Sequence, residues 1–126
     1  MITRDEVLMG RDKDVPLSTK QEQNLALLLT CLNNFRAVYG RPMIVSSGYR
    51  TPAINAATKG AAKRSNHIQC LACDFKDPDG ALDAWCLANL TVLSNCGLYL
   101  EDPAATPGWC HLQAAAPASG RRVFIP

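Results

Sequence analysis

The chain contains only two histidines, and each lies in a segment whose residue types suit a metal site. His67 stands a few residues ahead of Asp74, and His111 lies in the middle of the strand-like segment 109–113. Two imidazoles and one carboxylate, with a fourth position left for water, form a recurring ligand set of catalytic zinc ions. His67, Asp74 and His111 therefore predict a zinc site and hydrolytic chemistry.

Helical patterns surround these residues. A capping box formed by Ser18 and Gln21 begins a long amphipathic helix, and Gly40 supplies its end. Its apolar positions recur at helical spacing: Leu25, Leu28, Leu29, Leu32, Phe35 and Val38. We expect a short helix over 53–57 and another after Gly80. The inner face of the latter should carry Leu82, Trp85, Cys86 and Leu90.

Strand patterns lie between and after the helices. We expect strands over 43–46, 71–75, 97–101 and 109–113, and an edge strand over 121–125. Mixed helices and short strands with hairpin-like connections predict an α+β fold, with a small antiparallel sheet packed with helices. At 126 residues, we expect a single domain, 1–126.

Strand alternation predicts which side chains share a face. Asp74 should face away from Leu71, Cys73 and Phe75, which should point to the core. His111 should share a face with Trp109 and Gln113, while Cys110 and Leu112 point inward. If the two strands are neighbours, Asp74 and His111 project from one surface, and His67 can reach them from the preceding loop.

Three ordered blocks resemble one family of zinc peptidases, which includes VanX, VanY and phage L-alanyl-D-glutamate endolysins. The segment 46–55 is similar to the family's S-G-Y-R-T-P-x-x-N signature. The segment 65–74 resembles S-x-H-x-x-G-x-A-x-D, and 109–112 resembles its W-x-H-hydrophobic element. The resemblance runs from about residue 43 to 113. It implies a hedgehog-like α+β fold related to the D-Ala-D-Ala peptidases, and cleavage of peptide bonds in peptidoglycan stem peptides.

By position, the resemblance assigns the zinc ligands to His67, Asp74 and His111. It makes Arg50 a contact for substrate oxygens, where a guanidinium can stabilise developing negative charge; the alternative is a structural ion pair. Further substrate contacts implied by the resemblance are Tyr49, Ser65 and Trp109, although Ser65 is equally suited to capping its loop.

The chain departs from the family pattern at two positions. Cys70 stands where the family usually has glycine, and Gly108 stands where many members carry the acid that serves as general base. A zinc-bound water needs a carboxylate to accept its proton. The nearest candidates are Glu101, which we prefer, and Asp102; the alternative is that both are ordinary carboxylates at the end of a strand.

Six cysteines require an interpretation. Without a visible signal peptide, reduced thiols are expected rather than disulfides. Cys31 and Cys86 fall on apolar helix faces. Cys70 and Cys73 have the spacing of a metal or redox pair, but strand alternation favours buried thiols for this pair.

Composition limits the partners. A net charge of +2 without a long basic run argues against nucleic acid, and no segment is apolar enough for stable membrane insertion. The only basic cluster, formed by Lys59, Lys63 and Arg64, is either a solvated loop or a contact for an anionic substrate. We expect a monomer made in the cytoplasm that acts at the bacterial cell wall, in the periplasm or in a phage particle.

Two function classes follow. The first is a zinc metallopeptidase of the carboxypeptidase or endopeptidase type, most simply a phage lysin or virion-associated cell-wall hydrolase. The second is a non-catalytic zinc-containing binding module of the same fold. Gly108 favours the second class, whereas Arg50 and the basic loop favour the first.

Overall fold

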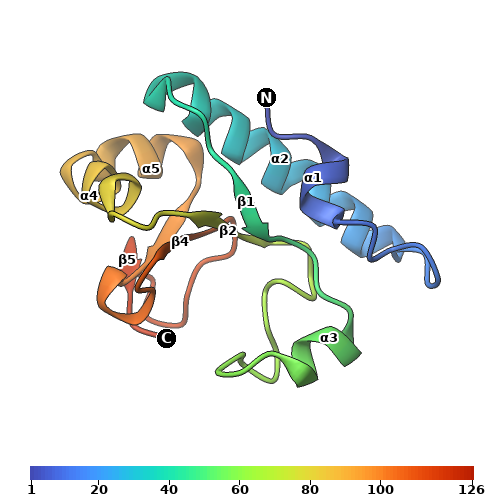
Figure 1. Ribbon diagram of the computed structural model, residues 1–126. Coiled ribbons are helices and arrows are strands. Elements are labelled where there is room, and N and C mark those ends of the chain that lie inside the picture. The colour runs from blue at the N-terminus through green and yellow to red at the C-terminus, as the bar shows by residue number, and fades with distance from the viewer.

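The computed structural model describes residues 1–126 and is built around a five-stranded sheet (Figure 1). Across the sheet, the strands are β1 (Val45–Ser47), β2 (Ala72–Lys76), β4 (Trp109–Gln113), β3 (Tyr99–Glu101) and β5 (Val123–Phe124). Neighbouring strands are antiparallel, except that β5 runs parallel to β3. The predicted α+β fold is confirmed, and the expected edge strand in the tail is present with a parallel partner.

The helices are α1 (Arg4–Leu8), α2 (Thr19–Tyr39), α3 (Pro52–Ala57), α4 (Ala81–Ala88) and α5 (Leu90–Cys96), with a 3-10 turn at Pro103–Ala105. In Figure 1, α1, α2, α4 and α5 gather above the sheet, whereas α3 and the loop that follows it extend below. None of these helices has the length and apolar character that crossing a membrane requires.

The long helix α2 begins and ends as predicted. The Ser18 hydroxyl accepts from the Gln21 amide, the Gln21 side chain accepts from the Ser18 amide, and Gly40 adopts a left-handed conformation at the end. The expected inward position of Val38 is wrong, since this side chain is 58% exposed. Tyr39 instead turns inward and packs edge-on against Trp85, with ring centroids 5.1 Å apart.

The segment after Gly80 forms two helices rather than one. Asn89 leaves the helical conformation and therefore ends α4. Its side-chain amide donates to the carbonyl of Trp85 in the last turn of that helix. Leu90 therefore begins α5 and is 38% exposed, so its expected place on the inner face of the first helix is wrong. Leu82 does lie in the core, as predicted.

The face of the sheet that meets the helices forms the hydrophobic core. Cys73 and Phe75 on β2, and Cys110 and Leu112 on β4, are fully buried there, which confirms the predicted alternation. Leu71 precedes β2 and is only half-buried outside the core, so its expected inward position is wrong. The opposite face is left for polar residues.

The cysteines are free, and five of the six are buried. Cys31 and Cys86 lie in the core, as predicted, and so do Cys70 and Cys73. Burial raises the pKa of the Cys70 thiol to about 11 and the pKa of Cys73 well above its usual value. These two side chains therefore act as small apolar core residues.

Candidate active site and metal centre

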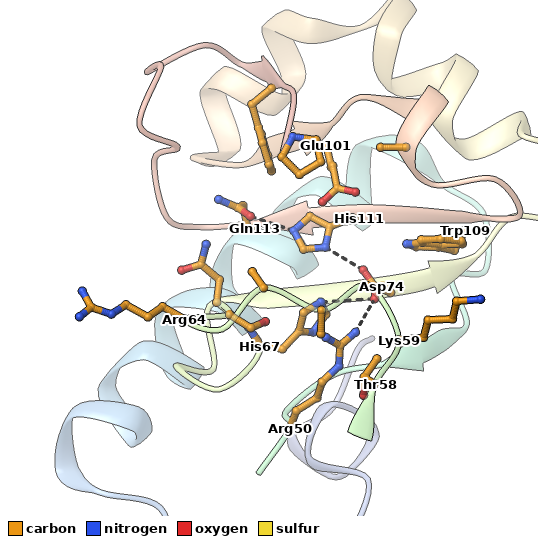
Figure 2. A pocket seen from close by; sticks show the side chains of 18 residues that line it. Arg50, Thr58, Lys59, Arg64, His67, Asp74, Glu101, Trp109, His111 and Gln113 are labelled. Atoms are coloured by element: carbon orange, nitrogen blue, oxygen red, sulfur yellow. Dashed lines mark hydrogen bonds and ion pairs between the residues drawn. The ribbon is translucent and has the colours of Figure 1, made fainter. Parts of the chain in front are cut away.

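The register of two neighbouring strands brings the first two predicted ligands together. Asp74 on β2 lies directly opposite His111 on β4, and Nδ1 of His111 is 2.8 Å from Oδ1 of Asp74. His67 approaches from the loop between α3 and β2, with its Nε2 3.3 Å from Oδ2 of Asp74. One donor atom from each residue lies within 4.8 Å of the others, and all three side chains are buried (Figure 2).

His67 is oriented by the backbone that follows β1. Its Nδ1 is 2.9 Å from the carbonyl oxygen of Gly48, and its backbone carbonyl accepts from the Arg50 amide. A Cβ on Gly48 would lie 2.0 Å from the carbonyl oxygen of Val7, so only glycine lets α1 approach this closely. The Ser65 hydroxyl accepts from the His67 amide, so Ser65 caps its own loop.

The loop that carries His67 is also fixed by hydrogen bonds from α2. Side-chain amides on α2 donate to two of its carbonyls, Gln21 to Ile68 and Asn24 to Gln69, each at 2.9 Å. Cys70 then takes a left-handed conformation with φ of 59°. This backbone favours glycine, which explains why glycine suits this position of the motif and why cysteine there is strained.

The donor set fits a metal ion. The carbonyl of Gly48 can only accept, so Nδ1 of His67 carries the proton and Nε2 turns a lone pair toward Asp74. A lone pair that faces a buried carboxylate calls for a cation between them. Two imidazole nitrogens and one carboxylate oxygen match a catalytic metal set with one position left open.

The charges in the cluster reinforce one another. Burial raises the pKa of Asp74, but its contacts with His111 and His67, when these rings are protonated, outweigh burial, so the pKa lies well below its usual value. Burial lowers the pKa of His111, but the hydrogen bond and the charge of Asp74 outweigh it, so the pKa lies above its usual value. Asp74 is thus held as a carboxylate, which is the form that binds metal.

A pocket opens onto this cluster, and Glu101 and Asp74 are the only side-chain carboxylates that line it. Glu101 ends β3, the strand that pairs with β4, and Figure 2 shows its carboxylate beside His111, on the side away from Arg50. Burial, together with the negative charge of Asp74, raises the pKa of Glu101 against the opposing effect of the histidines. Glu101 is therefore placed to take up a proton beside the metal site.

Arg50 enters the same pocket from the other side. Its guanidinium is 3.4 Å from Oδ2 of Asp74 and 3.4 Å from Oδ1 of Asn55, and its Nε donates to Ser47. Arg50 thus forms the buried ion pair that was one of its two expected roles. It also lines the pocket, where a substrate contact would have to lie. Lys59 and Arg64, from the basic loop, line the pocket as well.

The structure does not place every candidate at the site. Trp109 and Ser65 line the pocket, but Tyr49 is buried in the hydrophobic core and does not. Asp102 does not line it either, because its carboxylate caps the 3-10 turn by accepting from the Ala104 amide. The structure therefore does not bring Tyr49 and Asp102 to the pocket with the other candidates.

Three contributors to the site were not predicted. The Gly48 carbonyl orients His67, and the Gln113 side chain contacts Nε2 of His111 at 2.8 Å. Phe124 on β5 packs edge-on against the His111 ring, with centroids 6.1 Å apart. The i, i+2 spacing of His111 and Gln113 on one strand was a signal for the second contact, whereas no local pattern indicated the other two.

A family model for peptidase M15 matches residues 3–105 of the chain. The chain belongs to the M15 family. Peptidases of this family are zinc-dependent, which agrees with the buried cluster of two histidines and one aspartate. Comparisons with curated proteins and with solved structures give no match.

The M15 match covers His67 and Asp74 but ends before His111. The third member of the cluster is therefore placed by the pairing of β2 with β4 rather than by the family match. Gly108, the position at which the sequence resemblance leads us to expect an acid, has φ of 91°, a conformation that strains other residues. In this M15 chain, the free carboxylate of the pocket comes from Glu101 instead.

Proposed function

We propose that this M15 protein is a zinc peptidase that hydrolyses peptide bonds in peptidoglycan stem peptides, as a phage lysin or a virion-associated cell-wall hydrolase. One observation carries the proposal. A buried cluster of His67, Asp74 and His111 opens into a pocket whose only other side-chain carboxylate is Glu101. The peptidase family and this chemistry agree.

His67, Asp74 and His111 would hold the zinc ion. When bound, zinc supplies Lewis-acid activation of a water molecule and of the scissile carbonyl. Two nitrogen donors and one carboxylate are a set that zinc accepts readily. The chain supplies all three ligands and also the hydrogen bonds that orient the two histidine rings.

Glu101 is the general base of the proposed reaction. Its carboxylate accepts a proton from the attacking water as the water oxygen bonds to the peptide carbon. It then returns the proton to the amine nitrogen as the carbon–nitrogen bond breaks. The raised pKa of Glu101 suits both steps, since the group must accept a proton and release it again.

Arg50 and the basic loop suit a substrate that carries negative charge. The guanidinium of Arg50 is pre-positioned by Asp74, Asn55 and Ser47, so little conformational freedom is lost when it contacts substrate oxygens. Lys59 and Arg64 add positive charge at the rim of the pocket. Stem peptides carry carboxylates, and we propose that these cations attract them.

A non-catalytic zinc-binding module is the alternative. Gly108 favoured it in the sequence, because the usual acid is missing there. Glu101 weakens it, because a structural metal site needs no partly buried carboxylate beside it in an open pocket. The proposal of an enzyme therefore rests on Glu101 as much as on the metal ligands.

Digestion of defined muropeptides tests the proposal. Zinc-loaded protein should cleave one stem-peptide bond, a chelator should stop cleavage, and added zinc should restore it. The masses of the products identify the bond and separate a carboxypeptidase from an endopeptidase. Binding of muropeptides without any cleavage by the zinc-loaded protein would favour the binding module.

A further inference from the structure

Gln113 is a buried polar side chain whose amide has a fixed orientation. It is 3% exposed, and its Nε2 donates to the backbone carbonyl of Ala115 at 2.8 Å. A carbonyl oxygen can only accept, so the NH2 group of Gln113 must face Ala115. The amide oxygen therefore faces Nε2 of His111, at 2.8 Å (Figure 2).

This orientation determines where His111 carries its proton. An amide oxygen has no hydrogen, so Nε2 of His111 must be the donor of this hydrogen bond. Nδ1 lies 2.8 Å from the carboxylate of Asp74, which also can only accept, so without a metal both nitrogens donate and the ring is protonated. A metal ion would replace the proton on Nδ1, and the proton on Nε2 would stay with Gln113. Phe124 packs against the ring from the side and limits its rotation.

We propose that Gln113 is a positioning residue that selects Nδ1 of His111 as the metal donor by holding the proton on Nε2. The proposal rests on the metal site of the proposed function. Gln113 acts through His111 and is given no contact with the reacting atoms. It is the counterpart of the Gly48 carbonyl, which holds the proton of His67 on Nδ1 and leaves Nε2 free.

The side chain suits this role better than its closest replacements would. Leucine would leave Nε2–H of His111 without an acceptor in a buried site, which is unfavourable. Glutamate would keep an acceptor for His111, but its second oxygen would face the Ala115 carbonyl and repel it. Replacing an outer hydrogen-bond partner of a metal ligand typically weakens metal affinity by about 10- to 100-fold.

The experiment combines a tautomer measurement with a metal titration. Nitrogen-15 NMR of labelled histidine in the zinc-loaded protein reports which nitrogen of His111 still carries a proton. Competition with a chromophoric chelator gives the zinc affinity. The variants are Gln113→Leu and Gln113→Glu. Gln23→Leu is the control, because the Gln23 side chain on α2 forms no hydrogen bond in the structure.

The wild type should show His111 with its proton on Nε2 alone. Gln113→Leu should show a mixture of tautomers and a zinc affinity that is about 10- to 100-fold weaker. Gln113→Glu should keep the Nε2–H tautomer, and Gln23→Leu should match the wild type in both measurements. A merely structural role for Gln113 would lower affinity in the variants without moving the tautomer.

Two results would contradict different parts of this proposal. Wild-type protein that binds zinc but carries the His111 proton on Nδ1 would overturn the role of Gln113 and leave the proposed function standing. This reading needs only the wild type, so a variant that fails to fold does not weaken it. Wild-type protein that binds no zinc would overturn the metal site itself, together with the role of Gln113 in it.

Discussion

Nδ1 of His111 lies 2.8 Å from Oδ1 of Asp74, because the two residues occupy directly opposed positions on β4 and β2. The contact therefore depends on strand register. A slip of one strand by one residue would, for example, pair Asp74 with Cys110 and His111 with Cys73, and would leave Asp74 and His111 on opposite faces of the sheet. The hydrophobic core behind the strands, which contains Phe75 and Leu112, opposes such a shift.

Replacing Glu101 should separate catalysis from metal binding. Glu101→Gln keeps the shape of the side chain but removes the proton acceptor, so kcat on muropeptides should fall by about 100- to 10,000-fold while zinc stays bound. Asp102→Asn is the matched control, since Asp102 caps the 3-10 turn outside the pocket, and it should keep its activity. Undiminished turnover by Glu101→Gln would remove this residue from the mechanism.

Gly48→Ala should damage both stability and the metal site. The added Cβ would lie 2.0 Å from the Val7 carbonyl oxygen, so α1 or the Gly48 carbonyl that orients His67 must move. We expect a loss of roughly 3 kcal/mol in the free energy of unfolding, together with weaker zinc binding. Urea denaturation and zinc titration measure the two effects.

Gly10→Ala serves as the comparison for Gly48. Gly10 has φ of 71° and open space around its Cβ position, so alanine there should cost only about 1 kcal/mol for the left-handed backbone. Zinc affinity should be unchanged. Equal effects of the two substitutions would mean that the close approach of Val7 is unimportant for the site.

Asp83 should make stability fall as pH rises. Burial, aided by the negative charges of Asp77 and Glu101, raises the pKa of Asp83 to about 6 against the effect of Cys110, and Oδ1 has no hydrogen-bond partner. The folded protein therefore holds a proton that the unfolded chain releases near its ordinary pKa, so this stabilisation is present at low pH and lost as pH rises through about 6.

Asp83→Asn should remove this dependence. Between about pH 4 and about pH 7, the wild type should lose roughly 1–2 kcal/mol more of its free energy of unfolding than the variant does, after allowance for solvent screening. Urea denaturation of both proteins across this range gives the difference. Parallel pH profiles would show that Asp83 does not carry the extra proton.

Zinc binding should weaken as pH falls. His111 must lose a proton to become a ligand, and in the metal-free protein burial lowers its pKa less than Asp74 raises it. The pKa thus lies above its ordinary value, so proton competition should begin at a higher pH than for an unperturbed histidine. Chelator competition across a pH series measures the effect, and a flat affinity from about pH 5 to pH 8 would speak against it.

The cluster could be predicted from the sequence because its chemistry follows short-range patterns. Alternation on 109–113 placed His111 on the polar face, and the same rule placed Asp74 on the polar face of the preceding strand. The choice of Glu101 over Asp102 also came from the sequence, and the pocket lining now supports it. Local spacing is thus enough to indicate ligands that lie on strands.

The remaining features depend on contacts that the sequence does not reveal. Phe124 reaches His111 through a parallel pairing of β5 with β3, and Gly48 acts through its approach to α1. Tyr49 resembled a site residue by its place in the motif, yet it packs into the core. Leu90 followed a helical spacing, but Asn89 ended the helix first.

The zinc content of the purified protein tests the central claim most directly. If His67, Asp74 and His111 share one ion, elemental analysis should find about one zinc per chain in the wild type. His111→Ala should hold almost none, while Asp102→Asn should hold as much as the wild type. A wild-type protein that takes up no zinc, or a His111→Ala variant that keeps a full equivalent, would contradict the account.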